Sequence, residues 1–150
     1  MDVPAQFHFQ HRRLVEFADT DLAGIMHFAN MFRFVESAEH AFFRSLGHPV
    51  HTAHGAEHEG WPRLEVSCKY LKPARFEQTL EIGLRIEELR TTSLRYSFWI
   101  FEDRDRALIA SGSFSTIHVE LNSGTQAIRK TPIPPALRAS LEAVMGPSKT

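Results

Sequence analysis

The sequence predicts a single α+β domain in which one long helix packs on one face of an antiparallel sheet. The chain has 150 residues and is 43% hydrophobic, enough for one domain with a real core. Apolar side chains follow a helical period over one early segment and alternate with polar ones in several later segments. An early helix followed by consecutive strands is typical of an α+β fold.

The first predicted strand covers residues 7–17, and the helix runs from about Ile25 to Leu46. Along the helix, apolar residues share one face and charged residues lie opposite. Gly47 and Pro49 together form a stop signal for it. Residues 48–60 are predicted to be a polar loop.

Alternating segments after this loop predict the remaining strands, each with one packed face and one wet face. They cover residues 64–70, 79–87, 94–101 and 108–119. Residues 123–150 carry Pro132, Pro134 and Pro135 before a short helical stretch at about 136–145. This tail is predicted to be peripheral to the single domain, 1–150.

Composition excludes several classes of function. A formal net charge of −1 gives no bulk attraction to nucleic acid or an anionic membrane. Residues 1–10 carry no basic leader or apolar core of a signal peptide, so the cytoplasm is the expected location. The single cysteine, Cys68, permits no intrachain disulfide or Cys-only metal cluster, and we expect a packed thiol.

The predicted helix is aromatic around much of its circumference, which favours a homo-oligomer.

Asp19 and Asp21 are the chief candidates for chemistry. They precede a small-residue turn at Ala23 and Gly24 and then the predicted helix. A helix start presents unpaired N–H groups that can hold an oxyanion, and a nearby carboxylate can act as nucleophile or general base. Either Asp could instead simply cap the helix, which is a common role for this residue.

A longer set of residues carries a resemblance to a known family. It comprises Asp19-Thr20-Asp21, Ala23-Gly24-Ile25, Phe28-Ala29-Asn30-Met31-Phe32, Trp61-Pro62-Arg63 and Lys72-Pro73-Ala74-Arg75-Phe76. This set resembles the signature of hotdog-fold acyl-CoA thioesterases of the 4-hydroxybenzoyl-CoA thioesterase and YbgC-like group. The similarity extends over roughly residues 7–122.

The resemblance implies a hotdog fold, an antiparallel sheet wrapped around one long central helix, assembled as homodimers or homotetramers. It implies that Asp21 is the catalytic carboxylate, acting as nucleophile or general base. The backbone N–H of Phe28, with Gly24 nearby, is the implied contact for the thioester carbonyl, and Asp19 and Asn30 have supporting roles. The substrate is then an acyl-CoA, and no cofactor or metal is required.

The chain departs from the family pattern at two places. His27 precedes the proposed carbonyl contact, where it can touch substrate, tune Asp21 or simply pack under the sheet. Relatives grip CoA with a basic run between two strands, whereas only Arg90 and Arg95, with Ser93 between them, remain here. Phosphate binding is therefore weaker or is shared with Lys72 and Arg75.

Other charged and titratable residues are predicted to be structural. Glu36 and Glu39 on the helix are expected to be paired acids. His48, His51, His54 and His58 are expected to form a surface loop and not a zinc site.

Two alternative functions remain open: a hydratase or dehydratase pairing His27 with Asp21, and a non-catalytic thioester-binding subunit. The sequence does not select the acyl group.

Overall fold

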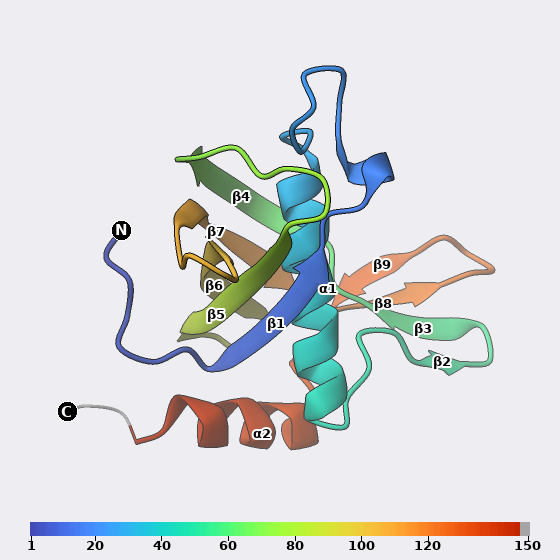
Figure 1. Cartoon of the computed structure of the whole chain (residues 1–150). Helices are drawn as coiled ribbons and strands as arrows, with labels where there is room; N and C mark the ends of the chain where they lie inside the picture. Colours follow the sequence, from blue (N-terminus) through green and yellow to red (C-terminus); the bar gives the residue numbers. More distant parts are fainter. Residues whose placement is uncertain (148–150) are drawn as a thin grey trace.

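The computed structural model describes residues 1–147, in which a five-stranded antiparallel sheet wraps around helix α1 and a smaller four-stranded sheet lies beside it (Figure 1). The large sheet has the order β1-β5-β6-β7-β4, and the small one β2-β3-β8-β9. The elements are β1 Phe9–Leu14, η1 Phe17–Asp19, α1 Asn30–Ser45, β2 Ala53–His54, β3 Glu57–Gly60, β4 Arg63–Tyr70, β5 Thr79–Leu89, β6 Ser93–Glu102, β7 Leu108–Ile117, β8 Val119–Asn122, β9 Ile128–Lys130 and α2 Pro135–Met145.

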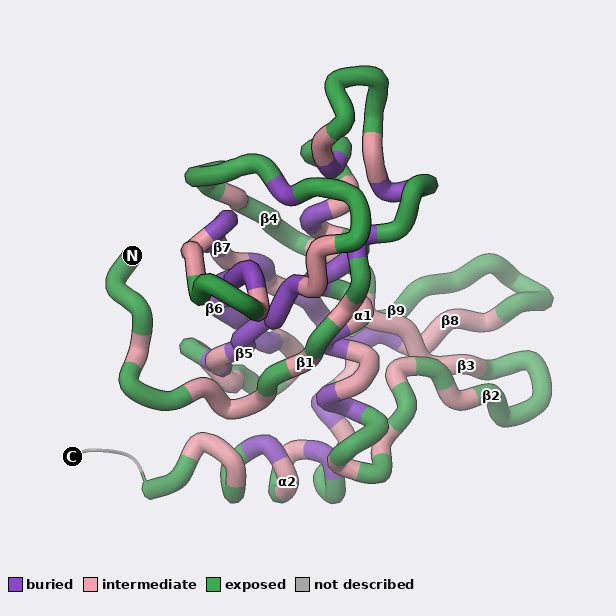
Figure 2. Tube along the Cα trace, in the orientation of Figure 1, coloured by how far each residue is buried: buried purple, intermediate pink, exposed green. Residues whose placement is uncertain are grey.

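The core lies between α1 and the helix-facing side of β5, β6 and β7, where Figure 2 shows the buried trace. Alternation in β5 places Leu80, Ile82, Leu84 and Ile86 on that side, none more than 3% exposed. These side chains pack against the aromatic face of α1. The predicted α+β arrangement of sheet and central helix is therefore confirmed.

Strand β4 is an edge strand whose helix-facing side is incompletely covered. Val66 pairs with buried Phe114 across the sheet, yet Val66 is 46% exposed and Leu64 is 60% exposed. Helix α1 contacts β1 and β5, which lie at the opposite edge of the sheet from β4. An open groove of about 310 Å³ therefore remains between α1 and β4. The predicted packing of one β4 face is therefore not achieved within a single chain.

The predicted polar loop at residues 48–60 is wrong in part, because it contains β2 and β3. Strand β3 pairs with β8, which continues the β4–β7 pairing into the second sheet. His54 and His58 lie on these short strands. Within residues 1–147, no group of His, Cys, Asp or Glu is arranged to hold a metal ion.

The prediction of a peripheral tail is also wrong. Ile133, Leu137 and Leu141 are at most 3% exposed and join the core beside the lower end of α1 in Figure 1. Arg138 of α2 donates to the carbonyls of Arg90 and Thr91 in the β5–β6 turn. In the described part of the chain, neither helix has the length and apolar character needed to span a membrane.

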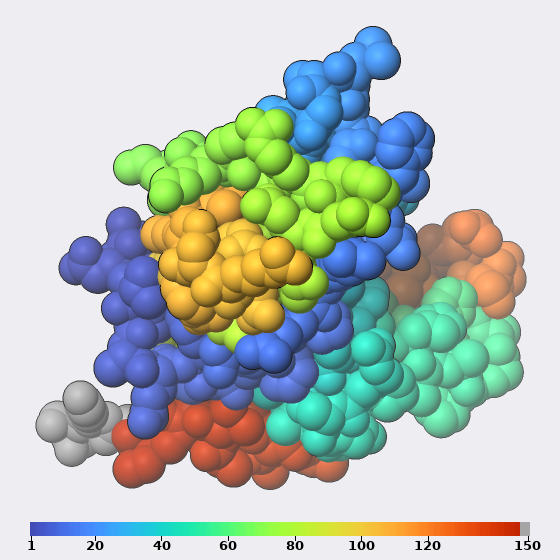
Figure 3. All heavy atoms as spheres, viewed as in Figure 1, coloured from blue at the N-terminus to red at the C-terminus, as the bar shows by residue number. Residues whose placement is uncertain are grey.

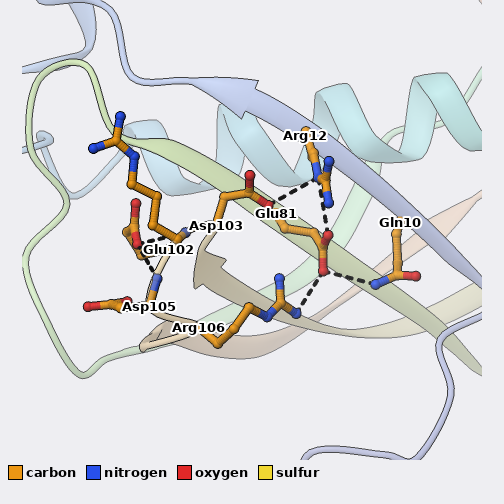
Figure 4. Close-up of polar contacts among 8 residues, drawn as sticks. Gln10, Arg12, Glu81, Glu102, Asp103, Asp105 and Arg106 are labelled. Atoms are coloured by element: carbon orange, nitrogen blue, oxygen red, sulfur yellow. Dashed lines mark hydrogen bonds and ion pairs between the residues drawn. The ribbon is translucent and has the colours of Figure 1, made fainter.

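On the face of the large sheet that points away from α1, a charged cluster centres on Glu81 (Figure 4). Its carboxylate accepts hydrogen bonds from Gln10 at 2.9 Å, Arg12 at 3.3 Å and Arg106 at 2.8 Å. Arg12 also pairs with Asp103 at 3.1 Å. The carboxylate is buried but fully paired, and it ties β1 to β5 and to the β6–β7 turn.

Candidate active site

The segment between β1 and α1 forms a tight turn, so α1 begins at Asn30 and not at Ile25 as predicted. The N–H of Asp21 donates to the carbonyl of Ile25 at 2.9 Å, and the N–H of Gly24 donates to the carbonyl of Asp21 at 3.0 Å. Gly24 has φ +75°, a conformation that glycine adopts without a steric penalty. The Ala23-Gly24 pair therefore makes a hairpin-like turn that projects Asp21.

Asp19 and Asp21 have different surroundings. Asp19 is 5% exposed, and its Oδ2 accepts the N–H of Glu16 at 2.9 Å. Its carbonyl accepts the N–H of His27 at 2.9 Å and the side-chain amide of Asn30 at 2.8 Å. Asp19 and Asn30 together fix the path of the chain into α1.

Asp21 is exposed and only partly hydrogen-bonded. Its Oδ1 accepts the N–H of Ala23 at 2.9 Å, in the manner of an Asx-turn. Within residues 1–147, its Oδ2 has no hydrogen-bond or ion-pair partner. One carboxylate oxygen therefore orients the side chain while the other is available for chemistry.

Asp21 borders an open pocket of about 500 Å³. The pocket lies between the turn before α1 and the segment after β4, which project side by side in Figure 3. Met26 donates its N–H to the carbonyl of Ala74 at 2.8 Å, joining these two segments. The lining residues are Asp21, Ile25, Met26, Phe28, Met31, Tyr70, Leu71, Lys72, Pro73 and Ala74.

Phe28 also borders this pocket, two residues before the first helical residue. The N–H groups of the neighbouring residues all donate hydrogen bonds. Met26 donates to the carbonyl of Ala74, His27 to the carbonyl of Asp19, and Asn30 to the carbonyl of His27. The Ala29 N–H donates to His27 Nδ1 at 3.3 Å. In the described structure, the N–H of Phe28 alone in this run has no acceptor. A free donor thus lies in a residue that shares the pocket with Asp21.

Two other predicted site residues lie near the pocket without lining it. Gly24 does not border the pocket, and its N–H donates to the Asp21 carbonyl, so a carbonyl contact at Gly24 stays a prediction. His27 is exposed, and its ring lies against that of Phe28 at 4.7 Å between centroids. It is therefore not packed under the sheet. Among residues 1–147 it makes no hydrogen bond or ion pair with Asp21.

The predicted CoA-binding residues separate into two groups. Lys72 borders the pocket, and Arg75 follows it in the same segment. Arg90 lies in the β5–β6 turn, and Ser93 and Arg95 lie at the beginning of β6. All three are near the start of β4, whereas the pocket adjoins the end of β4. Within one chain, the two groups lie at opposite ends of the sheet and cannot share one phosphate.

Arg90 and Arg95 are also already paired. They contact the Glu88 carboxylate at 3.1 and 3.3 Å. This one carboxylate compensates one of their two positive charges. By contrast, Lys72 forms no ion pair among the described residues.

Glu36 and Glu39 are paired acids, as predicted. Both contact the guanidinium of Arg63, with Glu36 at 3.2 Å and half-exposed and Glu39 almost fully buried. Burial raises the pKa of Glu39, and this effect outweighs the lowering by the Arg63 hydrogen bond and charge.

Tyr70 is a site residue that the sequence did not single out. Its hydroxyl donates to the carbonyl of Phe28 at 2.9 Å, and its ring borders the pocket. In the sequence it is one of four alternating residues of β4. Only its place next to the Lys72–Phe76 motif separates it from Leu64 or Val66.

Comparison with solved structures confirms the hotdog fold. A gentisyl-coenzyme A thioesterase superposes with a TM-score of 0.71 at 26% identity, over 89% of this chain and 99% of the other. A thioesterase-like protein of Pseudomonas aeruginosa has a TM-score of 0.76 at 25% identity, over 91% of this chain and 100% of the other.

Sequence comparison shows the family. Residues 15–141 match the model of the thioesterase-like superfamily. A protein of Aquifex aeolicus that carries only the general name of an esterase is 33% identical over 116 residues, 77% of this chain and 87% of that protein. A 1,4-dihydroxy-2-naphthoyl-CoA hydrolase of Thermosynechococcus vestitus is 29% identical over 133 residues, 88% of this chain and 87% of that one.

The chain therefore belongs to the thioesterase-like superfamily. The predicted class of enzyme, a thioester hydrolase, is confirmed.

Proposed function

We propose that this protein hydrolyses an acyl-CoA thioester to a free acid and CoA, with Asp21 as the catalytic carboxylate. The supporting observation is that Asp21 and Phe28 border one pocket, one with a free carboxylate oxygen and the other with a free N–H. A thioester carbonyl placed between them receives a hydrogen bond on oxygen while its carbon faces Asp21. This is the arrangement that acyl transfer requires.

Two routes are compatible with this geometry. In the first, Asp21 Oδ2 attacks the carbonyl carbon, the C–S bond breaks, and water then hydrolyses the acyl anhydride. In the second, Asp21 takes a proton from water, which attacks the same carbon directly; the C–S bond then breaks, and the departing CoA thiolate takes up a proton. In both, the Phe28 N–H stabilises the negative charge that develops on the carbonyl oxygen.

The pocket wall favours an aryl acyl group. Phe28 and Tyr70 present aromatic rings, and Met26 and Met31 present thioethers, which make favourable contacts with aromatic rings. A volume of about 500 Å³ lies within the range of ligand pockets. The relatives named for naphthoyl-CoA and gentisyl-CoA point to the same class of acyl group.

Lys72 is our candidate for the phosphates of CoA, with Arg75 beside it, because Lys72 borders the pocket without an ion-pair partner in the described chain. Arg90, Ser93 and Arg95 reach a CoA molecule at this pocket only from a second subunit. A homodimer or homotetramer in the cytoplasm remains our prediction for the assembly. The hydratase alternative is less favoured because His27 and Asp21 are not joined.

The test is the Asp21→Asn variant, assayed by thiol release from aryl, short, medium and long acyl-CoAs. We expect turnover to fall by roughly 10² to 10⁴, because the carboxylate is lost while the side-chain shape is kept. Glu77→Gln, an exposed carboxylate after β4, is the matched control and should retain full activity. Undiminished hydrolysis by Asp21→Asn would remove Asp21 from the mechanism. Saturable CoA binding by the wild type without thiol release would favour a non-catalytic subunit.

A further inference from the structure

We propose that Tyr70 is a positioning residue of this site, which holds Phe28 so that its backbone N–H points toward the substrate carbonyl. The inference rests on the proposed function and adds a residue to it. Tyr70 is the last residue of β4, and Phe28 precedes α1, so the contact joins the sheet to the turn that carries the free N–H.

The contact is specific in both its polar and apolar parts. The Tyr70 hydroxyl donates to the Phe28 carbonyl at 2.9 Å. The two rings meet edge to face, with centroids 6.5 Å apart and planes at 81°. Both residues border the pocket. Tyr70 therefore fixes the Phe28 backbone and also forms part of the pocket wall.

Phe28 needs such a support because the helix does not provide one. It lies before the cap residue Ala29, and from the helix its carbonyl accepts one long hydrogen bond, of 3.3 Å, from the N–H of Met31. His27 on one side is held by the Asp19 carbonyl. Within residues 1–147, the Tyr70 hydroxyl supplies the one hydrogen bond from the large sheet to the Phe28 backbone. Strands hold attached groups more rigidly than loops do, which suits a site that depends on donor direction.

The Tyr70 hydroxyl keeps its proton, and so remains a hydrogen-bond donor, at neutral pH. Desolvation raises the pKa of Tyr70 to about 12, with a further contribution from neighbouring Cys68.

The chain supplies its own matched control. It contains two tyrosines, and the other, Tyr96, is fully buried with a hydroxyl that has no hydrogen-bond partner in the described structure. Tyr70→Phe and Tyr96→Phe remove the same atom, but only the first removes a bond to Phe28. Tyr70→Leu removes the pocket ring as well as the hydroxyl.

The first measurement is of kcat and KM, with the acyl-CoA that the wild-type protein hydrolyses fastest in the thiol-release screen. We expect Tyr70→Phe to lower kcat roughly three- to tenfold, the loss typical of one neutral hydrogen bond, with KM changed less than twofold. Tyr96→Phe should leave both constants unchanged, and Tyr70→Leu should also raise KM. Equal kcat in Tyr70→Phe and wild type would overturn the proposal while leaving the hydrolysis itself established.

Amide NMR is the second measurement, and it does not depend on turnover. Tyr70→Phe should shift the resonances of Phe28 and Ala29, whereas Tyr96→Phe should leave them in place. Unshifted Phe28 and Ala29 resonances would overturn the positioning role even if kcat fell. A wild type that releases no thiol from any acyl-CoA would defeat the proposed function, and the NMR comparison would still decide whether Tyr70 holds Phe28.

Discussion

Replacing Arg63 by Met tests whether Glu39 is a buried charge that depends on one partner. The Glu39 side chain is 1% exposed, and Arg63 is its only ion-pair partner among the described residues. Methionine keeps the apolar stem of the arginine but removes the guanidinium, which lies over the Phe114 ring, and leaves the carboxylate uncompensated. A buried carboxylate in that position either stays ionised at high cost or takes up a proton.

The cost of taking up a proton sets an upper limit on the destabilisation. Glu39 in the unfolded chain ionises near its ordinary pKa of 4.5. Protonating it in the fold at pH 7 then costs about 3.4 kcal/mol, since each unit of pH is worth about 1.36 kcal/mol. At pH 5.5 the same step costs about 1.4 kcal/mol. Because the folded variant binds the proton more tightly than the unfolded chain, its stability falls as pH rises above 4.5.

We therefore expect the loss of unfolding free energy in Arg63→Met to approach 3.4 kcal/mol at pH 7 and to shrink by about 2 kcal/mol at pH 5.5. The assay is urea unfolding at both pH values, followed by tryptophan fluorescence at one protein concentration. Glu36→Gln is the control: this half-exposed carboxylate shares Arg63, and its loss should cost below about 1 kcal/mol. A loss below about 1 kcal/mol for Arg63→Met at both pH values would show that Glu39 is already neutral in the wild type, and would refute the reasoning.

Two further predictions concern other polar groups. Burial opposes ionisation of Glu81, but the hydrogen bonds and charges of Arg106 and Arg12 outweigh it and lower the pKa of this carboxyl. The stabilisation that results is present above pH 4.5 and should be lost as pH falls through the lowered pKa. Acid unfolding should therefore show a shallower loss below pH 4.5 in Glu81→Gln, and an identical pH dependence in both proteins would contradict this. Lys72→Gln should raise KM for acyl-CoA several-fold with kcat retained, whereas Arg95→Gln, already paired with Glu88, should change KM less. An equal rise in KM for both would instead indicate that both contact CoA.

The sequence was sufficient for the parts of the fold that depend on local periodicity. Strand β5 alternates cleanly, and its apolar residues from Leu80 to Ile86 face the core as predicted. The long helix was also predicted, but its start was placed at Ile25. Apolar residues at 25, 26 and 28 fit a helical period, and only the bridges from Thr20 to Met26 and from Ile25 to Arg75 show that this segment is extended.

Tertiary context explains the other errors. The tail could be read as a short helix, but nothing in its composition indicates that Ile133 and Leu141 complete the core at the end of α1. The exposure of Leu64 and Val66 could not be predicted either, because alternation identifies the two faces of a strand without saying whether either is covered. Strands β2 and β3 are too short and polar to be distinguished from a loop.

The proposed catalytic geometry depends on contacts that no motif records. Asp21 stood out as a candidate in the sequence because its side chain belongs to a recognisable signature, and its place in the turn follows from that local segment. The Phe28 N–H is different, since in our proposal its direction depends on the Asp19 carbonyl, eight residues earlier than His27, and on Tyr70, forty-two residues later than Phe28. A backbone donor carries no side-chain identity, so substitutions act on it only through the residues that hold the chain. The most informative substitutions for this site are therefore at Tyr70 and Asp19, and not at Phe28 itself.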